Sequence, residues 1–376
     1  MSTTSMTTSN ALTVKLWGLK GFADTLKSTA FGHMARRGTI MRASELDNAR
    51  KGDEVTVSYV GLLTGQGQTE GGTMTGNEEA LDLQAFSMRW NVVRHAVANP
   101  NDDTIEQTRT NVEFERNGRE MLRKWHASRL DASCFNQLAG INSTTMTVDG
   151  TVYSGAARTI VQGLNTVAAP STNRIVRAGA RANDQSLTSA DTFTLDLIDA
   201  AIERAATTYP TIEKLDGEEF DLFLHPHQIT DLRRDSSGKV QWLQIALANA
   251  QGGNSDMLQN TSGYSTGIVG RYGNVNIYSR DRVPLGQSSA DNSAVANTRR
   301  AVLCGKNALA FASRFSGALT DVKETGGSTP MMFKTELKDY EYIKGVEGRM
   351  IYGVKKVQFD GEDFGSIVIS TYAAAH

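Results

Sequence analysis

The chain has 376 residues, of which 39% are hydrophobic and 21% are charged, and its formal net charge at pH 7 is −2. A chain of this length can bury a sizeable core and form two domains or one large elaborated domain. The balanced charge gives no indication of a nucleic-acid-binding or membrane-surface protein. Two cysteines exclude a disulfide framework, and no apolar run approaches the roughly 18–20 residues of a membrane span. Because the first residues also lack a secretion signal, we predict a cytoplasmic product.

Residues 1–51 differ from the rest of the chain because they are rich in Ser and Thr, show weak apolar periodicity and carry an excess of basic residues. Residues 1–44 contain one acid, Asp24, and six basic residues: Lys15, Lys20, Lys27, Arg36, Arg37 and Arg42. Such a segment buries too little apolar surface to fold by itself. We therefore predict an N-terminal arm that a neighbouring subunit or packaged DNA orders, and favour the neighbour because the basic residues are spread. Deletion of residues 1–44 is expected to leave a folded, soluble subunit.

Residues 52–98 have the pattern of two strands joined by a glycine-rich tip. The segment 54–60 alternates apolar and polar residues, as a half-exposed strand does. A second alternating run over 81–97 slips in phase at Ala85–Phe86, which predicts a β-bulge there. Together the two strands predict an extended hairpin.

A helix is predicted over 111–139, with a glycine stop at Gly140. Its charged residues Arg123, Lys124 and Arg129 are expected on a solvated or subunit-facing side, and Cys134 is expected to be inert packing. The predicted apolar stripe consists of Phe114, Met121, Leu122, Trp125, Phe135 and Leu138.

Residues 141–190 are rich in Thr, Ser, Asn and Gly and predict loops with small strands. Beyond them, helices and strands follow without regular βαβ alternation, which favours the α+β class. The predicted helices cover 193–209, 227–235 and 240–250, and the predicted strands cover 220–226, 274–284, 299–313, 348–359 and 365–373.

The glycine-rich tip raises the question of a nucleotide site. The spacing of Gly65, Gly67, Gly71 and Gly72 does not match G-x-G-x-x-G because residue 70 is glutamate, and the tip has no Gly-Lys-Ser or Gly-Lys-Thr. The acids Glu70, Glu78, Glu79 and Asp82 would repel a polyphosphate. We therefore predict a flexible hairpin tip that binds no nucleotide or other cofactor.

Other chemistries find little support in the sequence. His225 and His227 flank a proline, but without Cys-x-x-Cys or His-Glu-x-x-His spacing they favour capping or surface groups over a metal site. The acidic pairs lie beside turn glycines, as solvated turns do. No catalytic residue is predicted. A soluble cytoplasmic enzyme, such as a hydrolase with an unrecognised site, is the alternative, followed by a nucleic-acid-binding module resting on residues 15–42.

Seven segments occur in an order typical of one family. They are "GLLTGQGQTEGGTMTGNEEALDL", "VVRHAV", "WHASRLDASCFNQLAG", "FLHPHQITDLR", "QWLQIALANAQGG", "DRVP" and "MIYGVKKVQFDGEDFGSIVISTYAA". These stretches resemble the coat proteins of N-four-type phages, major capsid proteins of tailed bacteriophages with the Hong Kong ninety-seven capsid fold. The agreement in order runs from about residue 45 to the C-terminus.

This resemblance implies a division of the chain and a function. The function is that of a major capsid protein of the virion, assembled in the host bacterial cytoplasm, which forms hexamers and pentamers of an icosahedral phage head around double-stranded DNA. The implied parts are an N-terminal arm (1–51), an extended loop (52–98), a peripheral domain with a spine helix (99–140), an insertion (141–189), an axial domain (190–325) and long strands returning to the peripheral domain (326–376).

The resemblance also implies partners. These are further copies of the chain, portal, scaffolding and decoration proteins, and packaged DNA contacted non-specifically, with no membrane. Scaffolding is expected to be encoded elsewhere or carried by a removed piece. Some members of the fold join the extended loop to a neighbour by a lysine–asparagine isopeptide bond, but this chain has no lysine between Lys51 and Lys124, so non-covalent contacts are expected. The implied contact residues are Gly65, Gly67, Glu70, Gly71, Gly72, Glu78, Glu79, Asp82, Trp17, Arg36 and Arg37.

Overall fold

The protein is described from a computed structural model. The residues that it describes are 29–42, 54–60, 65–79, 83–99, 114–163, 165–216, 218–234, 268–313, 331–338 and 343–376. The predicted helix at 240–250 and the predicted contact residues Trp17 and Asp82 lie outside these ranges.

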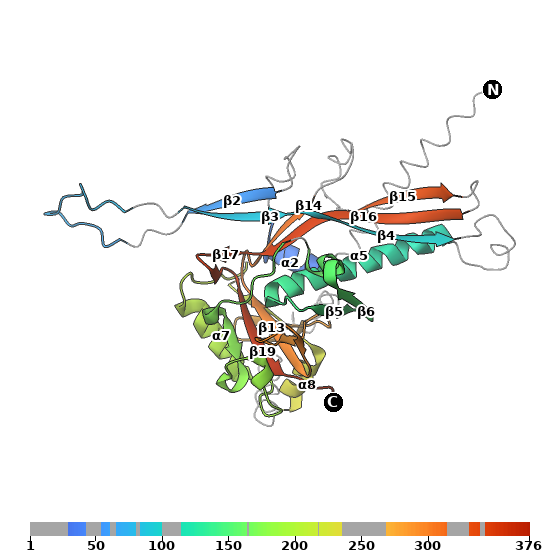
Figure 1. Ribbon diagram of the computed structural model, residues 1–376. Coiled ribbons are helices and arrows are strands. Elements are labelled where there is room, and N and C mark those ends of the chain that lie inside the picture. Colours follow the sequence, from blue (N-terminus) through green and yellow to red (C-terminus); the bar gives the residue numbers. More distant parts are fainter. Residues whose placement is uncertain are drawn as a thin grey trace, which may run out of the picture.

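A long layer of strands forms the upper part of the molecule in Figure 1. Its central strand is β16 (Ile343–Lys356), which pairs antiparallel with β4 (Asn91–Asn99), β14 (Leu309–Ser313) and β15 (Met331–Lys338), while β1 (Ile40–Arg42) adds to β14 in parallel. Helix α5 (Phe114–Ala139) runs beneath this sheet and packs mainly against β16.

A second sheet organises the lower part of the molecule. Its central strand β8 (Phe220–Leu224) is buried at all five positions, as predicted for this apolar-rich segment, and these positions include Asp221. Helices α7 (Leu195–Thr207) and α8 (Pro226–Arg234) belong to this part (Figure 1). The six strands, in spatial order, are β7 (Ile175–Arg177), β19 (Ser366–Tyr372), β13 (Thr298–Cys304), β8 (Phe220–Leu224), β10 (Val275–Ser279) and β9 (Ile268–Tyr272). Both sheets mix parallel and antiparallel pairs, which confirms the α+β class.

The predicted insertion at 141–189 contains small elements, as expected for its composition. They are the hairpin β5 (Thr145–Val148) and β6 (Thr151–Ser154), the short helix α6 (Thr159–Gln162), strand β7, and the 3₁₀ turns η1 (Gly155–Arg158), η2 (Thr172–Arg174), η3 (Ala178–Ala180) and η4 (Asp184–Ser186). Two further short hairpins are β11 (Gly286–Gln287) with β12 (Ala294–Val295), and β17 (Gln358–Phe359) with β18 (Glu362–Asp363).

The projecting hairpin is formed by β2 (Glu54–Val60) and β3 (Leu83–Arg89), but the predicted β-bulge at Ala85–Phe86 is wrong. Ala85 and Phe86 pair in continuous register with Ser58 and Val57. The buried face changes phase later, between Met88 and Val93, because the chain leaves this hairpin at Trp90 and enters β4, which pairs with β16. Phe86 and Met88 pack in a small cluster with Ala310, Ala312 and Val357, whereas Val93 joins the main core.

The last two long strands belong to different sheets, although both were expected to return to one domain. Strand β16 is central to the upper sheet, whereas β19 lies between β7 and β13 in the lower sheet. The chain passes from one sheet to the other through the β17–β18 hairpin, where Asp360 and Gly361 both have positive φ.

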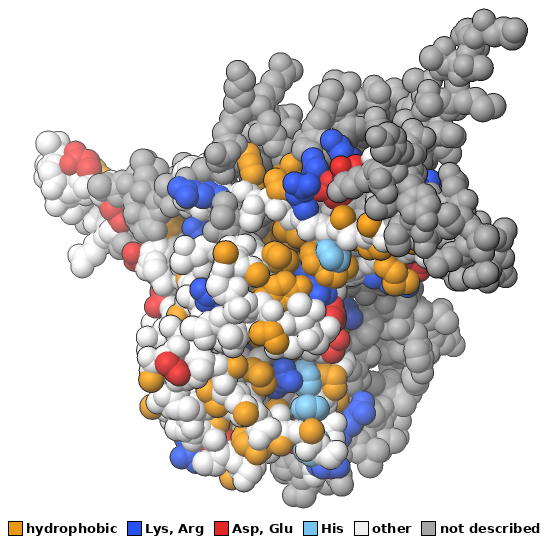
Figure 2. All heavy atoms as spheres, turned by 45° about the vertical axis from the view of Figure 1, so that its right-hand side comes forward, with side chains coloured by type: hydrophobic (Ala, Val, Ile, Leu, Met, Phe, Trp, Pro, Cys, Tyr) orange, Lys and Arg blue, Asp and Glu red, His pale blue; other side chains and the backbone are white. Residues whose placement is uncertain are grey.

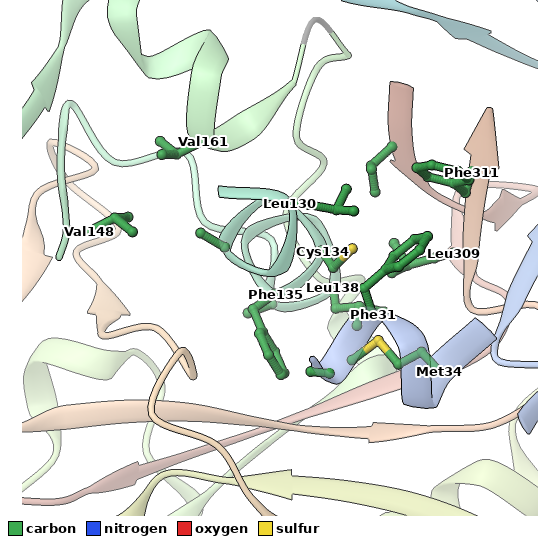
Figure 3. Packing of buried hydrophobic residues seen from close by; sticks show 14 of the residues in the cluster. Phe31, Met34, Leu130, Cys134, Phe135, Leu138, Val148, Val161, Leu309 and Phe311 are labelled. Carbon is green, nitrogen blue, oxygen red and sulfur yellow. The ribbon is translucent and has the colours of Figure 1, made fainter. Parts of the chain in front are cut away.

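The prediction that residues up to 44 form an arm is wrong for 29–42. These residues form helix α2 (Ala30–Arg37) and strand β1, and Phe31 and Met34 are 5% and 0% exposed. Figure 3 shows both side chains in one cluster with Leu138 of α5 and Leu309 of β14. A short apolar stripe is weak evidence for a helix in isolation, because packing rather than propensity stabilises most short helices. A truncation that spares helix α2 and its N-cap Thr29 therefore has to end at residue 28.

Helix α5 follows its prediction in its C-terminal half and departs from it elsewhere. It ends at Ala139, and the following Gly140 has a φ of +65°, the left-handed conformation that favours glycine after a helix. Leu122, Phe135 and Leu138 are buried as predicted, but Met121 is 53% exposed.

Two of the basic residues predicted on a solvated or subunit-facing side of α5 are buried within the subunit instead. The guanidinium carbon of Arg123 lies 5.3 Å from the ring centre of Phe333, and that of Arg129 lies 4.9 Å from the ring centre of Trp125. Arginine can be buried in this way because its planar head stacks on aromatic rings. Lys124 retains the predicted exposure.

We expect Phe31→Ala to lower the free energy of unfolding of the subunit by about 3–5 kcal/mol, since it leaves a cavity in the main core. Arg36→Ala, an exposed position on the same helix, is the control and is expected to change it by less than about 0.5 kcal/mol. Denaturant unfolding followed by circular dichroism measures both. Equal and small effects would mean that α2 is dispensable for the fold.

Candidate functional site

The described part of the hairpin tip, residues 65–79, is exposed at every position. Its backbone makes two turns, in which Gly72 N donates to Thr69 O over 2.8 Å and Asn77 N donates to Met74 O over 2.9 Å. Two of the predicted contact acids also bind the tip itself. Glu79 accepts a hydrogen bond from Gly65 N, and Glu78 accepts one from Gly76 N, both over 2.7 Å.

These contacts bear on what the tip can bind. The amides of Gly65 and Gly76 already donate to carboxylates, and three glutamates give residues 65–79 a formal charge of −3 with no lysine or arginine. An anionic ligand would therefore meet repulsion. The tip is suited to contact a surface that offers hydrogen-bond donors or positive charge.

Arg37, predicted as an inter-subunit contact, binds carboxylates of its own chain. Its Nη2 lies 2.8 Å from Glu219 and 3.2 Å from Asp221, and the buried Asp221 also contacts His33 Nε2 over 3.1 Å. Burial raises the pKa of Glu219, but hydrogen bonds from Arg37 and Asn276 outweigh this and hold that pKa below its usual range. The guanidinium thus fastens α2 to strand β8. Arg36 lies exposed on the same helix.

The histidine pair at 225 and 227 lies where β8 leads into α8. His227 N donates to His225 Nδ1 over 3.2 Å, and His225 N donates to Gln228 Oε1 over 3.0 Å, so His225 acts as a capping group at the start of the helix. Burial, with Arg299 and His227 nearby, lowers the pKa of His225 to about 3. Within the described ranges, no group of three or more His, Cys, Asp or Glu residues could hold a metal ion.

Cys134 and Cys304 are fully buried, and burial raises the pKa of both thiols well above the usual range. A neutral buried thiol is a poor nucleophile. The expectation that Cys134 is inert packing therefore agrees with its environment in the core (Figure 3).

A charged contact that the sequence did not predict joins the end of α5 to the lower sheet. Arg300 of β13, 6% exposed, donates from Nη1 to Ala139 O over 3.0 Å, and its Nε lies 2.6 Å from Asp184. A positive side chain at the C-terminal end of a helix satisfies carbonyls that have no intrahelical partner and favours the helix dipole. No sequence signal marks this contact, because the bonded residues lie 161 positions apart.

A second unpredicted contact holds the start of α2. Asp131 of α5 accepts hydrogen bonds from Ala30 N over 3.1 Å and from Phe31 N over 2.8 Å. Burial raises the pKa of Asp131 to about 6, against the opposing effect of these amides and of Arg280 and Arg282. The carboxylate thus satisfies amide donors at the helix N-terminus at the cost of its own desolvation.

Comparisons with known proteins identify the architecture. The sequence matches the family described as phage capsid protein over residues 5–375. This chain belongs to that family. A major capsid protein of Pseudomonas phage KPP25 is 27% identical over 357 residues, which cover 89% of this chain and 87% of that protein.

Solved capsid structures share the fold. The capsid of Ralstonia phage GP4 aligns with a TM-score of 0.68 and 24% identity, covering 91% of this chain and 89% of that chain. The capsid asymmetric unit of cyanophage Pam1 aligns with a TM-score of 0.62 and 19% identity, covering 90% of this chain and 89% of that chain. The fold is therefore the mixed α+β phage capsid fold of Hong Kong ninety-seven-like capsids.

Membership of this family confirms the function predicted from the sequence. The chain is a major capsid protein that forms the phage head, so its place is the capsid of the virion. It is a structural protein, and the alternative of a soluble enzyme is wrong. None of the helices in the described ranges has the length and apolar character needed to cross a membrane.

The raised pKa of Asp131 predicts a pH dependence of subunit stability. Because the folded-state value of about 6 lies above the ordinary 3.8, the folded subunit binds the proton more tightly, so this group stabilises the fold at low pH. That contribution, roughly 3 kcal/mol at about 1.4 kcal/mol per pKa unit, is lost as the pH rises from 4 through 6.

Asp131→Asn should remove this part of the pH dependence. Chemical denaturation of unassembled wild-type and variant subunits at pH 4 to 7 measures it, and the difference between the two slopes isolates the residue from other titrating groups. Parallel slopes for the two proteins would contradict the assignment.

Proposed function

We propose that this capsid protein builds its shell as hexamers and pentamers around double-stranded DNA, as an N-four-type coat protein. The observation that carries the proposal is the fully exposed tip at 65–79, which projects away from the body in Figure 1. Ordering an exposed glycine-rich segment costs conformational entropy, which contacts with a neighbouring subunit can offset. The seven N-four-type sequence segments support the narrower assignment.

We assign the parts of the subunit as follows. Helix α5 and the upper sheet form the peripheral domain, the β2–β3 hairpin is the extended loop, and the lower sheet with α7 and α8 is the axial domain. We also propose two revisions of the predicted boundaries: β19 would belong to the axial domain and β14 to the peripheral domain, because they pair with strands of the lower and upper sheets, respectively. The basic segment before residue 29 remains a proposed arm that contacts a neighbour.

Other partners are also proposals that rest on the sequence resemblance. They are portal, scaffolding and decoration proteins, together with packaged DNA contacted non-specifically. In the tip, Gly65, Gly67, Gly71 and Gly72 would provide backbone freedom, and Glu70, Glu78, Glu79 and Asp82 would provide charge, at contacts between subunits.

The direct test is assembly of the purified chain. We expect negative-stain electron microscopy and analytical sedimentation to show capsomers, tubes or closed shells, with scaffolding protein supplied where needed. A species that stays monomeric under every salt and scaffold condition would count against the proposed assembly.

The shell is expected to be held by non-covalent contacts, because residues 52–123 contain no lysine and the extended loop therefore carries no amine nucleophile. Particles boiled in detergent should run as a single monomer band on a denaturing gel. Ladders of high mass that resist both boiling and reductant would refute this expectation.

A further inference from the structure

A pocket of about 620 Å³ lies halfway along helix α5, beside the β5–β6 hairpin. Its lining residues come from α5, from β4, from that hairpin and from the segment after β10. We call it the α5 pocket. Pockets of this size are typical of small-ligand sites, and this one is larger than a single small ion. All of its lining residues belong to one subunit, so a ligand can bind there without assembly.

The wall of the α5 pocket carries an excess of positive charge. Its basic side chains are Lys124, Arg129 and Arg282. Among the described residues that line it, Asp149 is the one acid, so three positive charges and one negative charge leave a formal charge of +2. Burial, followed by the charge of Arg129, lowers the pKa of His95, so that ring is neutral at pH 7. Figure 2 shows basic and acidic side chains interspersed over the described residues of one face, which makes such an excess a local feature.

The carboxylate in the α5 pocket is already occupied by groups of the same chain. Oδ2 of Asp149 accepts hydrogen bonds from Ser128 and Arg129. Its Oδ1 accepts one from Arg282. Burial raises the pKa of Asp149, but hydrogen bonds from Ser128 and Arg282 outweigh this and hold that pKa below its usual range. Since this carboxylate stays ionised and engaged, the pocket offers a ligand donors rather than acceptors.

Lys124 supplies the most accessible donors. Its side chain is 59% exposed, and its Nζ lies 2.8 Å from Glu120 in an exposed pair one helical turn away. Exposed pairs of this kind add little stability, so they compete weakly with a ligand. Because an ammonium group has three N–H donors, Lys124 can keep this contact and still bind a further acceptor.

Two further donors come from other elements. The hydroxyl oxygen of Tyr153, on β6, accepts a hydrogen bond from Arg129 Nε over 2.9 Å. A hydroxyl group that accepts in this way still has its own proton to donate. Arg282, after β10, contacts Asp149 and Asp281, and its five N–H donors exceed what these contacts use. Donors from α5, β6 and the segment after β10 therefore line one pocket.

A phosphate dianion has the complementary chemistry. A phosphate monoester carries a charge of about −1.5 to −2 at pH 7 and three strong acceptor oxygens. This charge matches the excess in the α5 pocket, and the oxygens match donors that come from three different elements. A single carboxylate has one negative charge and two oxygens, so it would satisfy the pocket less completely.

We propose that the α5 pocket binds a phosphate dianion, held by Lys124, Arg282 and the hydroxyl group of Tyr153. Two sources share this chemistry, namely free phosphate and a phosphate monoester such as a nucleotide. The site goes beyond the structural function of the chain and differs from the glycine-rich tip, whose acids repel such a ligand. A ligand that binds the folded subunit and not the unfolded chain also stabilises the fold by mass action.

Equilibrium dialysis of unassembled full-length subunits against ³²P-labelled inorganic phosphate, at constant ionic strength, tests the proposal directly. We expect one saturable site per subunit. Lys124→Gln should weaken phosphate binding by about fivefold or more, because it removes a charged donor. Lys124→Arg keeps the charge and should bind phosphate within about twofold of wild type.

A second variant and a matched control sharpen this test. Tyr153→Phe removes the hydroxyl donor but keeps the ring, and it should weaken phosphate binding several-fold. Lys214→Gln is the control, since Lys214 is also an exposed lysine paired with a glutamate, Glu218, one helical turn away in sequence, and phosphate binding should be unchanged. Thermal melting of each variant, expected to match wild type within a few degrees, separates loss of the ligand from loss of folding.

Displacement of the labelled phosphate by adenosine monophosphate distinguishes the two sources. Displacement at lower concentrations than unlabelled phosphate requires would assign a phosphate monoester, and displacement at equal or higher concentrations would assign free phosphate.

Two results would overturn the proposal. The first is the absence of saturable phosphate binding by wild type, and the second is equal binding by Lys124→Gln and Lys214→Gln. If wild type binds a DNA duplex through Lys124 but binds no phosphate, the pocket contacts nucleic acid instead, which also overturns it. Because the site lies within one subunit, these results do not depend on whether the chain forms shells.

Discussion

The contact between Arg300 and the end of helix α5 joins the two halves of the subunit. The guanidinium comes from the lower sheet, binds the carbonyl of Ala139 at the end of the helix and is held by the buried Asp184. Breaking such a network by removing one partner leaves an uncompensated buried charge, which costs several kcal/mol, about 3–5. Gly140 turns the chain at the same place, where a side chain would collide with Pro170. The direction of the long helix relative to the lower sheet depends on this corner.

Helix α2 also connects helix α5 to the lower sheet. Asp131 of α5 binds its first amides, and Asp221 of β8 binds His33 and Arg37. The short helix therefore touches both halves, and its apolar side chains complete a core that contains residues of α5, β14 and the lower sheet. Since each carboxylate lies in a low-dielectric interior, these hydrogen bonds specify position more than they add net stability.

Much of the fold was predictable because its local patterns are strong. Three elements are marked directly by their own residues. Strand β2 has alternating apolar and polar residues, β8 is rich in apolar residues, and a glycine follows α5. What the sequence could not indicate was which elements meet. The apolar phase change at Ala85–Phe86 resembled a bulge, although both residues pair in continuous register with β2. Arg123, Arg129 and Arg37 were predicted on the surface by residue type alone. Their burial depends on aromatic rings and carboxylates far away in the sequence. The acidic character of the hairpin tip could be predicted, because it follows from neighbouring residues in the sequence.

The base of the β2–β3 hairpin has mechanical consequences. Phe86 and Met88 anchor it in a small cluster separate from the two larger cores, so a rotation of the hairpin would strain this cluster and the hydrogen bonds of Ser87 and Arg89 rather than those cores. A rotation of about 5° at this base would displace the far end of the two strands, about 20 Å away at about 3.3 Å per residue, by roughly 2 Å, and the tip beyond it by more. The hairpin is thus held over a short stretch at its base and projects over a much longer distance. One subunit structure can then serve positions of different curvature in a closed shell, with the angular difference absorbed at a few apolar side chains.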